Sequence, residues 1–329
     1  DTKLILDNVI ILMVHANPDG QELVSDWYMR NADTAKRTTS YLPRMYEKYA
    51  GHDNNRDFYM LNLKETQNMG RQLFVEWIPQ IMYNHHQTGP TGTVMAAPPY
   101  RDPANYWFHP AMITGLDLVG AALNHRFVLE HKPGLTFRAG SNYSTWWNGG
   151  MRTVGYFHNQ IGILTETIGN PTPIRVSLVP DRQLRSAGLP MPIAPQEWHF
   201  RQSIDYSVSA NYAFLDLASR YRETFLFNRW VMGTDQIKNG SKDNWTISPK
   251  RVDAMIAQIT KDRATASPEA NRAGGARGGA APDEHFFAAV ENWRDADCFS
   301  EQERLALEHR NQVVRQGVVN GRFNDAIKA

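Results

Sequence analysis

The chain has 329 residues, of which 42% are hydrophobic and nine are Trp, a composition typical of a globular protein with a sizeable core. Lys and Arg (35) nearly balance Asp and Glu (34), so the overall charge favours neither nucleic acid nor an anionic membrane surface as a partner. A single cysteine, Cys298, excludes an intrachain disulfide, and no run of eighteen apolar residues predicts a membrane span.

Short apolar runs alternate with longer amphipathic stretches over the first 230 residues, which predicts an α/β domain. Val9–Val14 is a continuous apolar run followed by the turn signal NPDG at 17–20, so we expect a buried strand that enters a loop. Apolar residues spaced three, four or eight apart predict a helix over 57–77 with one buried face.

Two further apolar runs, Ile81–Tyr83 and Ile161–Thr165, predict strands, and helical periodicity over 203–225 predicts a helix that closes the domain. The predicted divisions are an α/β domain, a helical extension, an Ala/Gly-rich linker and a C-terminal helical segment of unknown role, at 1–232, 233–263, 264–282 and 283–329. The linker is expected to be flexible because it has too few bulky apolar residues to offset its ordering entropy.

Polar clusters follow each of the three predicted strands: NPDG at 17–20, NHHQ at 84–87 and Glu-Thr at 166–167. Sites in open α/β sheets form where loops leave the carboxyl ends of strands, so these clusters are expected to converge. Taken singly, each cluster is better interpreted as a turn or a satisfied interior polar group than as part of a site.

The polar stretch 51–57 (GHDNNRD) has two interpretations. It is either a solvated loop with a helix N-cap at Asp57 or a site for an anion. In the second interpretation Arg56 offers a planar two-pronged donor and Asn55 a side-chain amide, both suited to a carboxylate.

These motifs occur in the order NPDG, D-x-N-R at 53–56, His86 and then Glu166 on a strand. Two longer segments, NHHQTGP and LTETIGNPTP, add to this motif order. Together they make the stretch from about residue 5 to 230 resemble the zinc carboxypeptidases of the carboxypeptidase A type, in a bacterial branch. The resemblance implies a mixed, mostly parallel central sheet flanked by helices, with 1–232 as the catalytic domain. It also implies a zinc-dependent exopeptidase that acts on peptides, or peptidoglycan-derived substrates, with a free C-terminus.

The resemblance implies a role for each matching position. His86 corresponds to the third protein ligand of the zinc, with His85 as the competing choice. Asp53 corresponds to a carboxylate that orients a zinc-bound histidine. Asn55 and Arg56 correspond to the pair that holds the terminal carboxylate of the substrate.

The remaining implied roles concern the reacting peptide bond. Arg30 corresponds to the arginine that polarises the scissile carbonyl, and Tyr143 to a mobile tyrosine over the substrate, with Tyr156 as the alternative. Glu166 corresponds to the catalytic carboxylate, which would accept a proton from a water activated by zinc and pass it to the leaving amine.

This family takes two zinc ligands from an H-x-x-E motif upstream of NPDG, and no histidine of the chain has a glutamate three positions later. We therefore expect an N-terminally truncated chain, with an incomplete zinc site and an incomplete sheet. The alternatives are a catalytically inactive relative that binds peptide or peptidoglycan, or a zinc amidase or deacylase on the same scaffold. The cysteine content suits cytosol and periplasm alike, and the resemblance favours a secreted or periplasmic protein.

Overall fold

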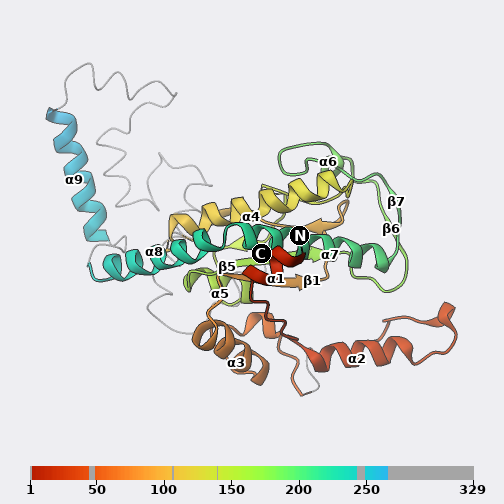
Figure 1. Cartoon of the computed structure of the whole chain (residues 1–329). Coiled ribbons are helices and arrows are strands. Elements are labelled where there is room, and N and C mark those ends of the chain that lie inside the picture. Colours follow the sequence, from red (N-terminus) through yellow and green to blue (C-terminus); the bar gives the residue numbers. More distant parts are fainter. Residues whose placement is uncertain (1, 44–48, 106, 139, 243–248, 266–329) are drawn as a thin grey trace, which may run out of the picture. The chain divides into compact units, whose positions relative to one another are not determined.

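The computed structural model describes residues 2–43, 49–105, 107–138, 140–242 and 249–265 (Figure 1). The chain divides into two compact units, residues 1–245 and 246–329. In the second unit the described part is the helix α9 (Pro249–Thr265). Almost all of the predicted linker and the whole predicted segment 283–329 lie outside the described residues, and the predicted boundary after residue 232 stays a prediction.

The central sheet of the first unit has the strand order β1-β5-β2. β1 (Ile81–His86) pairs in parallel with β5 (Ile161–Thr167), and β2 (Met95–Ala96) pairs antiparallel with β5. β1 and β5 confirm the two strands predicted from apolar runs. All seven residues of β5 are buried, as expected for a parallel strand covered on both faces. The mixed α/β fold implied by the resemblance is thus confirmed.

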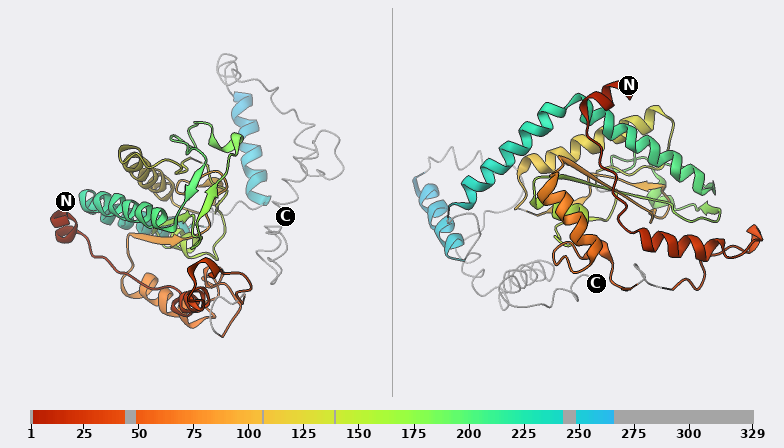
Figure 2. Two further views of the ribbon diagram at one scale, coloured as in Figure 1. Left: turned by 90° about the vertical axis from the view of Figure 1, so that its right-hand side faces the viewer. Right: turned by 60° about the horizontal axis from the view of Figure 1, so that its bottom comes forward.

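Helices cover both faces of this sheet (Figures 1 and 2). Neighbouring residues of a strand point to opposite faces. Ile161 of β5 lies against Gly115 of α4 (Pro110–Leu129), whereas the next residue, Gly162, lies against the backbone of α5 (Met151–Phe157). α7 (Phe200–Arg220) packs beside α4 on the first face, so α4 and α7 together cover one face and α5 covers the other.

The main hydrophobic core lies between the sheet and the pair α4 and α7. It contains Met112, Val119 and Leu123 of α4, Phe214 of α7 and Ile163 of β5, each of them at most 4% exposed. A smaller cluster of Phe58, Met69 and Val154 joins α3 (Lys64–Arg71) to α5. The sheet is therefore fixed mainly from the α4 and α7 side, and the loops around α3 are fixed through α5.

The helix predicted over 57–77 is shorter than expected. α3 spans Lys64–Arg71 and continues as a π-helical turn, η3 (Gln72–Glu76), but 57–63 is not helical. Leu61 has a φ of +54°, which a helix cannot contain. The carboxylate of Asp57 is fully buried and accepts the backbone N–H of Leu63 at 2.9 Å, so it fixes the turn that precedes α3.

The helix predicted over 203–225 is two helices, α7 and α8 (Arg222–Gly240), because Tyr221 between them leaves the helical region at φ −112° and ψ 23°. None of the described helices is long and apolar enough to cross a membrane. The other described elements are α1 (Thr2–Asn8), α2 (Pro18–Met29), η1 (Thr34–Lys36), η2 (Asn54–Arg56), β3 (Arg101–Ala104), β4 (Ser144–Thr145), β6 (Ile174–Val176), α6 (Pro180–Gln183) and β7 (Gln196–Trp198).

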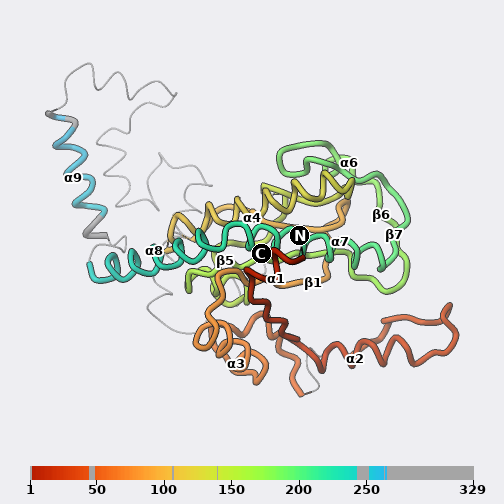
Figure 3. Tube along the Cα trace, in the orientation of Figure 1, coloured from red at the N-terminus to blue at the C-terminus, as the bar shows by residue number. Residues whose placement is uncertain are grey.

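The strand predicted at Val9–Val14 is wrong. This segment runs between α1 and α2 (Figure 3) without strand pairing to any described residue. The side chains of residues 10–14 are exposed, with Ile10 at 79% and Met13 at 93%. An apolar run becomes a strand only where a neighbouring strand takes up its backbone hydrogen bonds and other groups cover its faces. The described residues provide neither for Val9–Val14.

Candidate active site

Glu166 and His86 lie side by side where β5 and β1 end, because the parallel register pairs these two residues directly. Nδ1 of His86 donates to Oε2 of Glu166 at 2.8 Å. The backbone N–H of Thr88 donates to the same oxygen, also at 2.8 Å. The side chain of Glu166 is 8% exposed and that of His86 is 43% exposed. The pair therefore places a well-held carboxylate at the base of an open surface.

The alternation of the strand separates the two adjacent histidines. His85 points to the opposite face, where its Nε2 lies 2.9 Å from Oδ1 of Asn211 on α7 and its ring lies against Tyr83. Burial lowers the pKa of His85. The hydrogen bond to Glu166 raises the pKa of His86 against the opposing effect of burial. Of the two alternatives left open by the sequence, only His86 is next to Glu166.

The D-x-N-R motif forms the short helix η2, and Asp53 is its N-cap. Oδ1 of Asp53 accepts the backbone N–H of Asn55 at 2.8 Å, and its Oδ2 lies 4.0 Å from Nη1 of Arg56. The negative charge of Asp53 raises the pKa of His86 and the positive charge of Arg56 lowers it. The motif therefore lies within electrostatic reach of the Glu166–His86 pair.

Asn55 is tied to the helix that covers this face of the sheet. Its Oδ1 accepts the backbone N–H of Met151, the first residue of α5, at 2.9 Å. The side-chain oxygen is thus committed, and the amide NH₂ is the part that can meet a substrate. Arg56 is 54% exposed at its side chain, and its guanidinium lies 5.6 Å from the ring centre of Trp147. An exposed guanidinium beside an amide is suited to binding a carboxylate.

The two tyrosines considered for the substrate-covering role differ in their surroundings. Tyr143 is half-buried, and its hydroxyl donates to the carbonyl of Thr88 at 3.3 Å. Burial, followed by the charge of Glu166, raises the pKa of Tyr143 to about 12. Tyr156 is completely buried in the main core, where its hydroxyl donates to the carbonyl of Gly162 at 2.9 Å. Tyr143 is thus the one that faces the Glu166 end of β5.

Arg30 is not brought to this group. It is exposed at the C-terminal end of α2, where its guanidinium lies 3.8 Å from the ring centre of Trp27. The NPDG motif that precedes it acts as a helix start, since Oδ1 of Asn17 accepts the backbone N–H of Gly20 at 2.9 Å. α2 then leads away from the sheet (Figure 1). Within the described residues no contact joins Arg30 to Glu166 or His86.

Sequence reasoning missed Arg152 and Tyr100. Both are buried behind Tyr143, and the guanidinium of Arg152 lies 4.1 Å from the ring centre of Tyr100. A polar residue in an otherwise apolar helix such as α5 is a sequence signal that points to Arg152. Tyr100 has no such signal, because it acts through contacts with residues distant in sequence.

Catalytic zinc sites take three protein ligands. Among the described residues no three His, Cys, Asp or Glu side chains are close enough to hold a metal ion. His86 and Glu166 alone therefore do not fit a complete zinc site.

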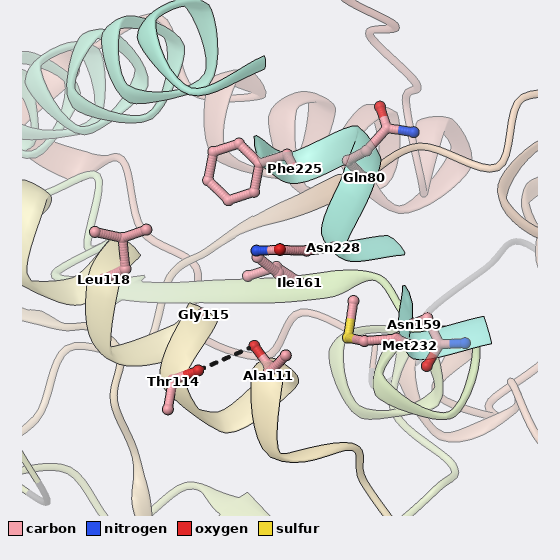
Figure 4. Close-up of a pocket in the computed structure, with 10 residues that line it drawn as sticks. All are labelled: Gln80, Ala111, Thr114, Gly115, Leu118, Asn159, Ile161, Phe225, Asn228 and Met232. Carbon is pink, nitrogen blue, oxygen red and sulfur yellow. Dashed lines mark hydrogen bonds between the residues drawn. The ribbon is translucent and has the colours of Figure 1, made fainter. Parts of the chain in front are cut away.

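A small cavity of about 80 Å³ lies at the other end of β5, next to Ile161 and between α4 and α8 (Figure 4). Its lining includes Thr114, Asn159 and Met232. Glu166 is five residues further along the strand and does not line the cavity.

Comparison with known families supports the geometry. The family model described as zinc carboxypeptidase matches residues 1–263, well over half of the chain. Comparisons with curated proteins and with solved structures give no match. The matched range includes the β1 and β5 strand ends and the D-x-N-R motif. The chain therefore belongs to the zinc carboxypeptidase family.

Proposed function

We propose that this protein is a carboxypeptidase, which hydrolyses the last peptide bond of substrates with a free C-terminus. Its family makes it a hydrolase of the zinc carboxypeptidase kind in general. The observation that supports the finer activity is the contact of Glu166 with His86 at the ends of β5 and β1, within electrostatic reach of Arg56. A carboxylate within electrostatic reach of a guanidinium that would bind an anion suits hydrolysis at a chain end.

In this proposal Glu166 accepts the proton of the attacking water and returns it to the leaving amine. Both of its described donors, Nδ1 of His86 and N–H of Thr88, address Oε2, so Oε1 has no partner among the described residues. Oε1 is thus the oxygen that would meet the water. Asn55 and Arg56 would hold the terminal carboxylate, and Tyr143 would cover the bound residue. His86 would be one ligand of the zinc on which the family depends, with Asp53 orienting the zinc-bound imidazoles.

The test compares two peptides that differ only in having a free or an amidated C-terminus. The proposal expects the free acid to bind about tenfold more tightly or better, because a charge-assisted hydrogen bond contributes about 1.5–3 kcal/mol. Arg56→Met should abolish this preference. Arg222→Met, which removes an exposed guanidinium paired with Glu223, is the matched control and should preserve it.

Equal hydrolysis of the free and amidated peptides would show that Asn55 and Arg56 do not hold a carboxylate, and would favour an amidase or deacylase. A second candidate function is binding of peptide or peptidoglycan fragments without catalysis. It is favoured by the lack of any three-residue metal group among the described side chains. Free-acid preference in binding, together with no hydrolysis after addition of zinc, would support that candidate.

A further inference from the structure

Arg152 is a buried cation with an unusual set of partners. It lies on α5 and is 7% exposed. Its Nη1 donates to the hydroxyl of Tyr156 at 3.0 Å, and its Nη2 donates to the backbone carbonyl of Ser144 at 2.6 Å. None of the ion pairs of the described residues includes Arg152, although the charge of Glu166 acts on it. Buried charges are normally paired, so this placement calls for a reason beyond packing.

Tyr100 lies directly over this guanidinium and connects it to the strand that carries Glu166. Its hydroxyl donates to the carbonyl of Leu164 at 2.6 Å and accepts the N–H of the same residue at 2.7 Å. Leu164 is two residues before Glu166 on β5. The ring of Tyr143 also packs against Tyr100. The two rings meet edge to face, with 6.5 Å between their centres.

Tyr143, Tyr100, Arg152 and Tyr156 therefore form a continuous group, the tyrosine–arginine stack, that runs from the surface to the core. Burial holds the pKa of Tyr100 and of Tyr156 above the usual range, so both are neutral and the stack keeps a single positive charge. Two of its members bind β5 backbone, since Tyr156 donates to Gly162 and Tyr100 to Leu164. The stack is thus anchored to the strand, whereas Tyr143 itself has, among the described residues, one long hydrogen bond, to Thr88.

We propose that Arg152 is a positioning residue that fixes Tyr143 relative to Glu166, through its hydrogen bond to the carbonyl of Ser144 and its contact with Tyr100. Ser144 follows Tyr143 directly, so a donor on its carbonyl restrains the backbone that carries the tyrosine. The cation over Tyr100 holds the ring against which Tyr143 packs. The restraint on Tyr143 is argued from geometry alone. Its effect on substrate binding rests on the proposed function.

The restraint on Tyr143 is tested by tyrosine nitration of the full chain with tetranitromethane, followed by peptide mapping with mass spectrometry. Arg152→Met should raise the nitration rate of Tyr143 about tenfold, because a desolvated cation–π contact and a hydrogen bond are lost together. Exposed Tyr221 should react at an unchanged rate. Buried Tyr206 reports unfolding and should stay protected.

Arg152→Lys is the conservative variant, since it keeps the charge but cannot reach Tyr156 and Ser144 together. In this variant the nitration rate of Tyr143 should rise less, about threefold. If Tyr206 becomes reactive in Arg152→Met, which would mean that this variant unfolds, the result for Arg152→Lys decides whether Arg152 positions Tyr143. An unchanged rate at Tyr143 in a folded variant would overturn the proposal. Nitration needs no substrate, so this outcome is independent of whether the protein is a carboxypeptidase.

The consequence for substrate is tested by a double-mutant cycle on the dissociation constant of a free-acid peptide. If Arg152 acts through the ring of Tyr143, then Arg152→Lys should weaken binding in the native protein and have no further effect in Tyr143→Ala, which lacks that ring. Additive effects of the two substitutions would mean that Arg152 serves only the stability of α5. The nitration rate of Tyr143 and the dissociation constant of the peptide together distinguish a positioning role of Arg152 from a purely structural one.

Discussion

Two apolar runs of this chain look alike in sequence and differ completely in structure. Ile161–Thr165 lies in β5, a strand buried along its whole length, whereas Val9–Val14 has no strand partner among the described residues and is exposed from Ile10 onward. The first run pairs with β1 along one edge and has helices on both faces, and the described residues give the second no such neighbours. Composition makes a segment able to form a strand, and its neighbours decide whether it does.

The same contrast extends to the candidate site. Glu166 and His86 are on adjacent strands of the sheet, and Asn55 is hydrogen-bonded to α5. Arg30 follows a helix without a buried residue, in the N-terminal segment 2–43, where Ile5 alone is buried. Residues held by the sheet converge, and those in the N-terminal segment do not. Four measurements test this difference between the sheet and the N-terminal segment.

The largest effect is expected on catalysis. In peptide hydrolysis assays with zinc supplied, Glu166→Gln should lower kcat by about 10²–10⁴-fold, as loss of a general acid–base group does. Arg30→Ala should change kcat by less than about threefold, because its guanidinium packs on Trp27 and touches neither Glu166 nor His86 among the described contacts. A large loss for Arg30→Ala would mean that the N-terminal segment closes onto the site during the reaction.

The next effect concerns stability. Ile163→Ala on β5 should reduce the free energy of unfolding by about 2–5 kcal/mol, since the side chain is fully buried. Met13→Ala should change it by less than about 0.5 kcal/mol, since that side chain is 93% exposed. Urea denaturation followed by circular dichroism measures both. A loss above 1 kcal/mol for Met13→Ala would show that the N-terminal segment packs in solution.

Two aspartates that both organise turns give a smaller contrast. Asp57→Ala should cost about 2–3 kcal/mol, because the buried carboxylate accepts from the N–H of Leu63 and from the hydroxyl of Thr66. Asp33→Ala removes the exposed N-cap of η1 in the N-terminal segment and should cost about 1 kcal/mol or less. Thermal unfolding measures both variants. Equal losses of stability in Asp57→Ala and Asp33→Ala would show that burial of the carboxylate does not set the size of the effect.

The smallest effect is a pH dependence within the core. Burial raises the pKa of Tyr206 to about 12, and its hydroxyl donates to the carbonyl of Pro133 at 3.0 Å. A raised pKa means that the contribution to stability is complete below pH about 10, the ordinary value, and is lost as pH rises through about 12. The free energy of unfolding of the wild type should therefore exceed that of Tyr206→Phe at lower pH, and this difference should disappear between these two pH values. Tyr212→Phe, at an exposed tyrosine, should show no such convergence.

The sequence predicted the family and the central strands better than the connections that position the candidate site. Periodicity and apolar runs identified β1 and β5, and the motif order identified the family. The helix over 57–77 was too long, because a local pattern does not reveal that Asp57 is buried or that Leu61 adopts a positive φ. Arg152 and Tyr100 were missed because their partners, Ser144 and Leu164, are brought to them only by folding.

The order of residues along the chain is enough to place particular residue types at the ends of the strands. The fold makes His86, and not His85, meet Glu166, because strand register and alternation set which face each side chain takes. It also leaves Tyr143 half-buried and encloses Tyr156 in the core. These side-chain positions depend on contacts between segments that are distant in sequence. They therefore cannot be predicted from any single segment.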